Sequence, residues 1–280
     1  MDAERAVGGP AGEHARAGEE AQGGAPRTAD LTGSPGAAAA TDPCGATDPS
    51  GTTDLLLHGD ITVIGRLADS SNETFLVEVS GEGDLTWAIY KPELGEAPLR
   101  DFPPGLYRRE RAAYLLSESL GWHLVPTTVL REEVPFGVGS LQRFVEHDRS
   151  AHYFTLVDDA PETHDDLRRI AVFDVLTNNT DRKSGHVLRG EDGRVWGIDH
   201  GLCFSARPKL RTVIWDFADE RIDADLLAAV APVVTEVDDE IAALLDDDEV
   251  DALRRRALRL VTEGRLPVDL TGMAFPWPLV

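Results

Sequence analysis

Hydrophobic and β-branched residues alternate with polar ones along several short segments in the first half of the chain. A two-residue period places apolar side chains on one face of a strand and polar side chains on the other. Five segments have this period or a strand-like composition: 61–67, 75–79, 86–91, 125–130 and 139–145. Because turns rich in Gly, Pro and small polar residues join them, we expect these segments to form an antiparallel sheet.

Apolar residues elsewhere recur at helical spacing, and capping residues mark the ends of these runs. Helices are expected at 106–120, 161–176, 223–234, 238–245 and 249–264. A hairpin of two short strands around Glu191–Gly193 interrupts the helical second half, and the final segment 275–280 is expected to dock through its aromatic residues. The order of elements predicts an α+β fold, with a sheet and one helix followed by a mainly helical half.

The first part of the chain has a different composition. Residues 1–53 are mostly Ala, Gly, Thr, Pro and Asp, with Val7 and Leu31 as the large aliphatic residues. Such a segment buries too little apolar surface to offset its loss of conformational entropy on folding. We therefore expect a disordered tail over 1–53 and a folded domain over 54–280.

Charge and cysteine content limit the classes of function. Fifty acidic residues stand against 27 basic ones, for a formal charge of −23, which opposes binding to nucleic acid and stable association with anionic membranes. The tail has neither a basic start nor an apolar core of a secretory signal, and no segment has the roughly 18 apolar residues of a membrane span. With two cysteines, Cys44 and Cys203, no structural disulfide is expected, and the prediction is a cytoplasmic protein.

The candidate chemistry is concentrated between Asn178 and Phe204. Asp181, Lys183 and His186 lie on a polar loop, and Asp199 follows the second strand of the hairpin. Phosphoryl transfer needs a carboxylate to orient the acceptor hydroxyl, cations on the phosphates, and ligands for a bridging metal. Asp181, Lys183 and Asp199 supply these groups in turn, although each residue alone is equally typical of a solvated loop.

Lys91 and Glu110 lie further upstream, at the end of a predicted strand and on a predicted helix. A lysine paired with a helical glutamate in this way directs its ammonium toward nucleotide phosphates. Taken alone, Lys91 is equally typical of a solvated strand end, and Glu110 of a helix surface among arginines. Together with the polar loop they favour a nucleotide-dependent phosphotransferase.

The order of these motifs resembles a family of atypical bacterial kinases related to phosphatidylinositol 3-/4-kinases and to HipA-like kinases. The resemblance rests on five sequence motifs: Ser71–Leu76, Ile89–Pro92, Arg109–Tyr114, Asn179–Lys183 and Ile198–Gly201. The last two motifs are the most specific. The resemblance implies a two-lobed protein-kinase-like fold, with an N-terminal lobe over about 54–146 and a C-terminal lobe over about 147–280. It also implies that ATP and Mg²⁺ are used.

The resemblance assigns a role to each motif. Lys91 is similar to the ATP-binding lysine, Glu110 to its helical partner, and Asp181 to the catalytic aspartate. Asp199 corresponds to the metal-binding aspartate of the DFG-like position, although His200 follows it where a phenylalanine is usual. The hinge that receives adenine is expected at Gln142, Phe144 and Val145.

The chain departs from the kinase pattern at two further places. The phosphate loop lacks the usual glycines and is expected to use Ser71, Asn72 and Thr74. His186 stands where an asparagine usually binds a second metal ion, and neutral imidazole suits Mn²⁺ better than Mg²⁺. His186 could bind the metal, hydrogen-bond to Asp181, or mark reduced activity.

The predicted reaction is transfer of the γ-phosphate of ATP to a hydroxyl of an unidentified protein or small molecule. One alternative is a nucleotide-binding pseudokinase that acts as a scaffold without transfer. A weaker alternative is transfer of AMP by the same residues.

Overall fold

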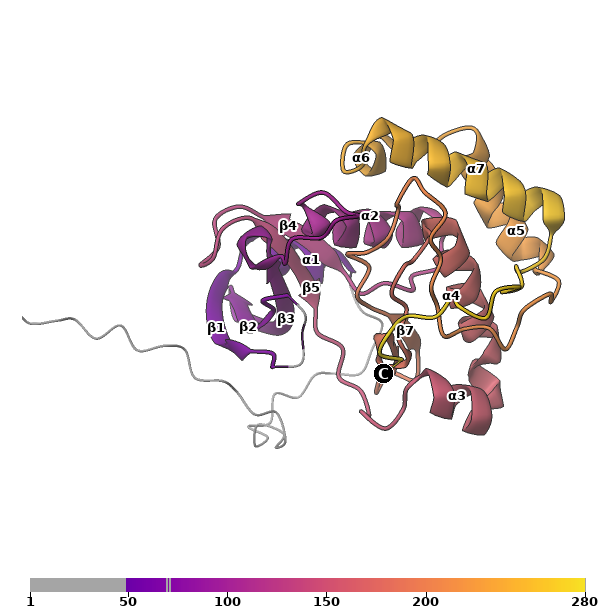
Figure 1. The fold of residues 1–280 in the computed structure, drawn as a ribbon. Coiled ribbons are helices and arrows are strands. Elements are labelled where there is room, and N and C mark those ends of the chain that lie inside the picture. The colour runs from indigo at the N-terminus through magenta and orange to yellow at the C-terminus, as the bar shows by residue number, and fades with distance from the viewer. Residues whose placement is uncertain (1–48, 69, 71, 280) are drawn as a thin grey trace, which may run out of the picture.

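The computed structural model describes residues 49–68, 70 and 72–279. In this part of the chain the N-terminal lobe is a five-stranded antiparallel sheet with strand order β1-β2-β3-β5-β4 (Figure 1). The strands are β1 (Asp60–Arg66), β2 (Phe75–Gly81), β3 (Asp84–Pro92), β4 (Thr128–Arg131) and β5 (Gly139–Arg143). The sheet predicted from the two-residue period is therefore confirmed.

Strand β3 shows how the alternation directs side chains to opposite faces. Ala88 and Tyr90 are fully buried in the core of this lobe, against Leu56, Val77 and other apolar residues. Because successive side chains of a strand point to opposite faces, Lys91 leaves that core and reaches the helix α2 (Leu106–Ser119) on the other side. Helix α2 was predicted almost to the residue.

A helix that the composition did not predict precedes the sheet. Helix α1 (Pro49–His58) takes in residues 49–53, which were expected to belong to the tail. Its anchor is Leu56, which is fully buried, and Arg131 donates hydrogen bonds to the carbonyls of Leu56 and Gly59 at its end. The packing of Leu56 therefore orders residues 49–53, whose small side chains offer little apolar surface of their own. Residues 1–48 of the expected tail lie outside the described residues.

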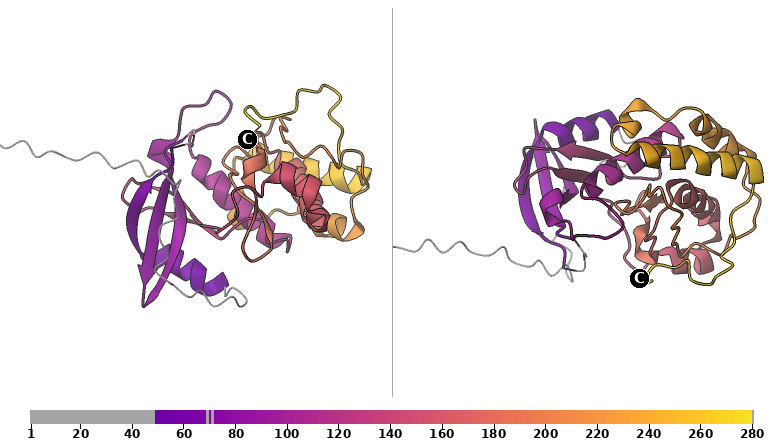
Figure 2. Two further views of the ribbon diagram at one scale, coloured as in Figure 1. Left: turned by 90° about the horizontal axis from the view of Figure 1, so that it is seen from below. Right: turned by 45° about the horizontal axis from the view of Figure 1, so that its top comes forward.

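The C-terminal lobe is mainly helical, as expected (Figures 1 and 2). Helix α4 begins three residues later than predicted, after a 3-10 turn over Pro161–Thr163, and helix α3 was not predicted. The elements are α3 (Tyr153–Asp159), α4 (His164–Thr177), β6 (Val187–Arg189), β7 (Val195–Gly197), α5 (Ala224–Val230), α6 (Asp239–Ala242) and α7 (Asp247–Glu263). No helix within the described ranges is both long and apolar enough to span a membrane.

The C-terminal segment docks only partly through its aromatic residues. Trp277 is 86% exposed, whereas Phe275 is 40% exposed and contacts the Trp215 ring edge-on, with 6.4 Å between the ring centroids. Backbone hydrogen bonds also anchor the segment: the Ser184 N–H donates to the Leu279 carbonyl at 2.8 Å, and the Thr212 N–H donates to the Ala274 carbonyl at 3.1 Å.

A buried ion pair joins α2 to the C-terminal lobe. Arg109 Nη2 lies 2.6 Å from Glu249 Oε1, and both side chains are less than 10% exposed. Glu249 also accepts from the Asp246 N–H in the capping box that starts α7. The helix that carries Glu110 is thereby fixed to the second lobe.

Candidate active site

Lys91 lies between two carboxylates that come from different lobes. Its Nζ atom is 2.5 Å from Glu110 Oε1 and 2.8 Å from Asp199 Oδ1. Burial of Lys91 favours its neutral form, but the charges of Asp199 and Glu110 outweigh this effect and raise its pKa above the ordinary value. Lys91 is therefore a permanent cation, and the ion pair expected with Glu110 is present.

The backbone places Asp199 at the point where β7 ends. Asp199 has a positive φ of 60°, which is uncommon for a residue other than glycine and is typical of functional sites. The next residue fixes the turn, because the His200 N–H donates to Glu110 Oε2 at 2.9 Å. Desolvation disfavours the charged form of Asp199, but Lys91 and other cations overcome it and hold its pKa well below its usual range. Glu110 thus positions both Lys91 and the backbone that carries Asp199.

Asp181 and Lys183 form a second pair on the polar loop. Lys183 Nζ lies 3.2 Å from Asp181 Oδ2, and the Asp181 N–H donates to Asn179 Oδ1. Burial raises the pKa of Asp181, against the opposing effect of Lys183. A raised pKa makes this carboxylate a better proton acceptor than an exposed aspartate.

His186 contacts Asp199 and not Asp181. Its Nε2 lies 3.2 Å from Asp199 Oδ2, while its Nδ1 accepts a long hydrogen bond, 3.4 Å, from the Lys183 N–H. Burial lowers the pKa of His186 to about 4, so the ring is neutral at neutral pH. Since Nδ1 accepts, the proton is on Nε2 and points to Asp199. The role of His186 as a metal ligand stays a prediction.

A buried arginine organises the loop, and the sequence analysis did not identify it. Arg182 is fully buried and lies 2.9 Å from Asp174 Oδ1. It also donates to the carbonyls of His186 and Ile198, at 3.1 and 2.7 Å, and to His200 Nε2 at 2.8 Å. The arginine therefore ties the loop of Asp181 to the strand end of Asp199. The one sequence signal was Asp174, an acidic residue among the apolar positions of its helix.

The predicted phosphate loop is only partly described. Ser71 lies outside the described residues. The side chain of Asn72 accepts from the Ala97 N–H at 2.9 Å, and Thr74 is 3% exposed and bonds to Ser70 Oγ. The Asn72 and Thr74 side chains thus stabilise the turn between β1 and β2, and their contacts to phosphate stay predictions.

The predicted hinge residues have other partners as well. Gln142 is 6% exposed, and its side-chain amide donates to Thr128 within the sheet. The Phe144 N–H donates to the Trp87 carbonyl, and the Val145 carbonyl accepts from His147. The Gln142 side chain is thus engaged within the sheet, and the expected contact of the hinge backbone with adenine stays a prediction.

The assembled site contains a cluster of Glu110, Lys91 and Asp199 and a separate Asp181–Lys183 pair. Within the described residues, no group of three or more His, Cys, Asp and Glu side chains is arranged to hold a metal ion. A metal ion that arrives with a polyphosphate would bring further oxygen ligands with it.

Comparisons with known proteins show which sequences and structures this chain is similar to. The family model for phosphatidylinositol 3- and 4-kinase matches residues 106–248. Protein Rv2133c of Mycobacterium tuberculosis is 40% identical over 261 residues, which cover 80% of this chain and 94% of that protein. Phosphatidylinositol 4-kinase gamma 4 of Oryza sativa subsp. japonica is 29% identical over 180 residues, which cover 50% of this chain but 30% of the rice protein.

Among solved structures, the Golgi casein kinase with Mn/ADP bound covers 83% of this chain, with 13% identity and a TM-score of 0.49. The extent of the family match and the identity to the mycobacterial protein define the family. The HipA-like part of the expected resemblance stays a prediction. With its two-lobed fold and its lysine, glutamate and aspartate residues in kinase order, this chain belongs to the phosphatidylinositol 3- and 4-kinase family of phosphotransferases.

Proposed function

We propose that this protein transfers the γ-phosphate of ATP to a hydroxyl group of a protein or small molecule. The observation that carries the proposal is the position of Lys91, held between Glu110 and Asp199. A lysine and a glutamate that are paired across a strand and a helix are the arrangement by which kinases align nucleotide phosphates. The family membership supports the same chemistry.

The residues fit a nucleotide that carries a divalent metal ion. Asp199 is 45% exposed, so its carboxylate is accessible and offers oxygen ligands. Carboxylate oxygen suits both Mg²⁺ and Mn²⁺, so either ion is compatible with Asp199. When bound, metal–ATP supplies the phosphoryl group and neutralises charge on its phosphates.

The residues of the chain would bind and orient the reactants. Lys91 donates to the phosphates and stays charged because two carboxylates surround it. Asp181 accepts a hydrogen bond from the acceptor hydroxyl, and its raised pKa favours uptake of the hydroxyl proton as the bond to phosphorus forms. Lys183 stabilises the negative charge that develops on the transferred group.

Two substitutions test the proposal. Lys91→Met should abolish both transfer and tight ATP binding, whereas Asp181→Ala should abolish transfer and preserve binding. The matched control is Arg259→Met, which removes an exposed cation of α7 paired with Glu263. ATP consumption and binding by calorimetry are the measurements. Full turnover in both active-site variants would show that the site is assigned wrongly.

A pseudokinase is the second candidate, and His186 favours it. In place of the asparagine that usually binds metal, this residue directs an N–H toward Asp199 Oδ2, so one oxygen of that carboxylate already has a partner. Thermal stability should be measured with ATP in the presence of Mg²⁺ and then of Mn²⁺. A metal-dependent shift with ATP consumption supports the kinase, and a shift without consumption supports the scaffold. Mass spectrometry of the modified protein distinguishes added phosphate from added AMP.

A further inference from the structure

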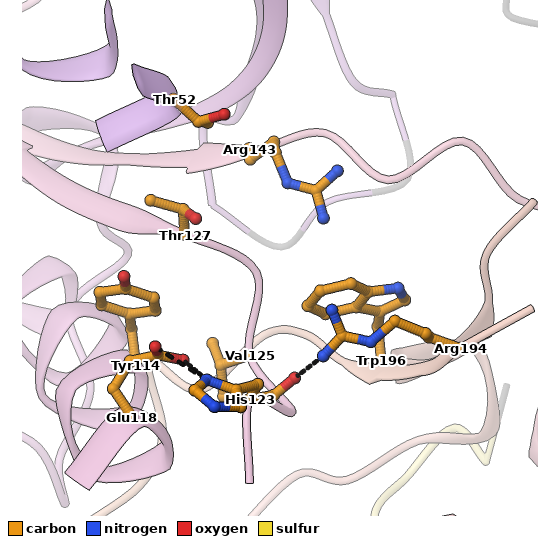
Figure 3. Close-up of a pocket in the computed structure, with 9 residues that line it drawn as sticks. All are labelled: Thr52, Tyr114, Glu118, His123, Val125, Thr127, Arg143, Arg194 and Trp196. Atoms are coloured by element: carbon orange, nitrogen blue, oxygen red, sulfur yellow. Dashed lines mark hydrogen bonds and ion pairs between the residues drawn. The ribbon is translucent and has the colours of Figure 1, made fainter. Parts of the chain in front are cut away.

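A pocket that no proposed catalytic residue enters lies between the two lobes, beside the end of α2. Its volume is about 280 Å³, close to the lower limit of roughly 300 Å³ for small-molecule sites. Residues of α2, β5 and the β6–β7 hairpin contribute to its walls (Figure 3). The lining residues are Thr52, Tyr114, Glu118, His123, Val125, Thr127, Arg143, Arg194 and Trp196.

Two arginines meet at one aromatic ring of this pocket. The guanidinium carbon of Arg194 is 4.1 Å from the centroid of the Trp196 ring, and that of Arg143 is 5.0 Å from it. Figure 3 shows both guanidinium groups beside the indole. Trp196 is 5% exposed, so it is a fixed support that holds two cations close together.

The arginines are positioned by the fold. Arg194 donates to the His123 carbonyl at 2.7 Å, and His123 has a positive φ of 50° that turns this carbonyl toward the hairpin. A guanidinium group carries five N–H donors, so one bond to His123 leaves Arg194 able to bind a ligand as well. The acidic group of the pocket, Glu118, is paired with His123 Nδ1 at 2.9 Å. The carboxylate therefore has its own partner at the far end.

We propose that this pocket binds a small phosphate monoester, with the phosphate between Arg143 and Arg194. Two guanidinium groups match a dianion better than a monocarboxylate, because each forms charge-assisted bonds to separate phosphate oxygens. The hydroxyl groups of Thr52, Tyr114 and Thr127 line the same pocket.

Phenyl phosphate is the probe for this site, and phenol is the uncharged control. Calorimetry on the full chain should show saturable binding of phenyl phosphate and none of phenol. Arg194→Ala should weaken the binding about tenfold or more, since a hydrogen bond to a charged group contributes about 1.5–3 kcal/mol. Arg189→Ala, on the same hairpin but paired with Glu162 outside the pocket, should bind as the unmodified protein does.

A second pair of variants separates this pocket from the active site. Trp196→Phe should keep the ring and weaken binding less than Arg194→Ala does, while Lys91→Met should leave binding unchanged. Loss of binding in Lys91→Met with full binding in Arg194→Ala would place the phosphate at the active site and overturn the proposal. So would the absence of saturable binding to a protein that is folded by circular dichroism. Neither readout requires transfer activity, so the proposed kinase function is tested separately.

Discussion

Asp174→Asn removes the counter-charge of Arg182 with little change in side-chain shape. The carboxylate is fully buried and receives hydrogen bonds from Arg182, Asn179 and Thr212. Since every neighbour is a donor, an amide nitrogen in place of one carboxylate oxygen would face another donor. The variant therefore leaves Arg182 as a buried charge without its anion.

The expected cost is large. Removing one partner of a buried ion pair costs about 3–5 kcal/mol in the free energy of unfolding. At about 2–4 °C per kcal/mol for a domain of this size, the melting temperature should fall by roughly 6–20 °C. Urea denaturation followed by circular dichroism measures the first quantity, and a thermal melt measures the second.

The control is Asp165→Asn on the same helix. Asp165 is 87% exposed and lies 3.3 Å from Arg168, and an exposed pair of this kind contributes about 1 kcal/mol or less. A loss below about 1 kcal/mol in Asp174→Asn would refute the argument that this pair is a buried, mutually dependent unit.

Three further outcomes are expected. Arg109→Met should lower the free energy of unfolding by about 3–5 kcal/mol, because it leaves the buried Glu249 carboxylate unpaired. Urea denaturation measures this loss, and an unchanged denaturation midpoint would contradict the prediction. Glu110→Gln should weaken ATP binding about tenfold or more in calorimetry, since Lys91 loses a charged partner; equal affinity would argue against the pair. Burial lowers the pKa of His186 to about 4 in the folded protein. Between about pH 6.5 and pH 4, His186 is therefore protonated in the unfolded chain but neutral in the folded one, and the free energy of unfolding falls as the pH falls. His186→Gln should remove up to about 3 kcal/mol of this fall in urea titrations, and equal slopes would contradict it.

The sequence predicted those parts of the fold that depend on local periodicity. The strands and α2 were found because alternation and helical spacing are visible in one segment at a time. Helix α1 was missed because its stability depends on Leu56, which packs against strands that follow it in the chain. The composition of residues 49–53 reflects only their own side chains, whereas in the fold the burial of Leu56 in the same helix orders them.

The same limit explains the outcome at the site. The sequence identified Lys91, Glu110 and Asp199 because each belongs to a recognisable motif. The structure brings Lys91 into contact with both carboxylates. Gln142 was expected at the nucleotide because the kinase resemblance places it at the hinge, where backbone groups receive adenine. Its pairing opposite Thr128 is a property of strand register, which the sequence of one strand does not contain.

His186 shows why the contacts matter more than the residue type. Lys91 occupies Oδ1 of Asp199 and the N–H of His186 faces Oδ2, so both oxygens have a partner. A carboxylate offers about four lone-pair sites, and these two bonds use half of them. The remaining sites can receive a metal ion without loss of either partner. A histidine that orients Asp199 in this way is compatible with phosphoryl transfer, because it fixes the carboxylate without adding a charge that would repel the metal ion.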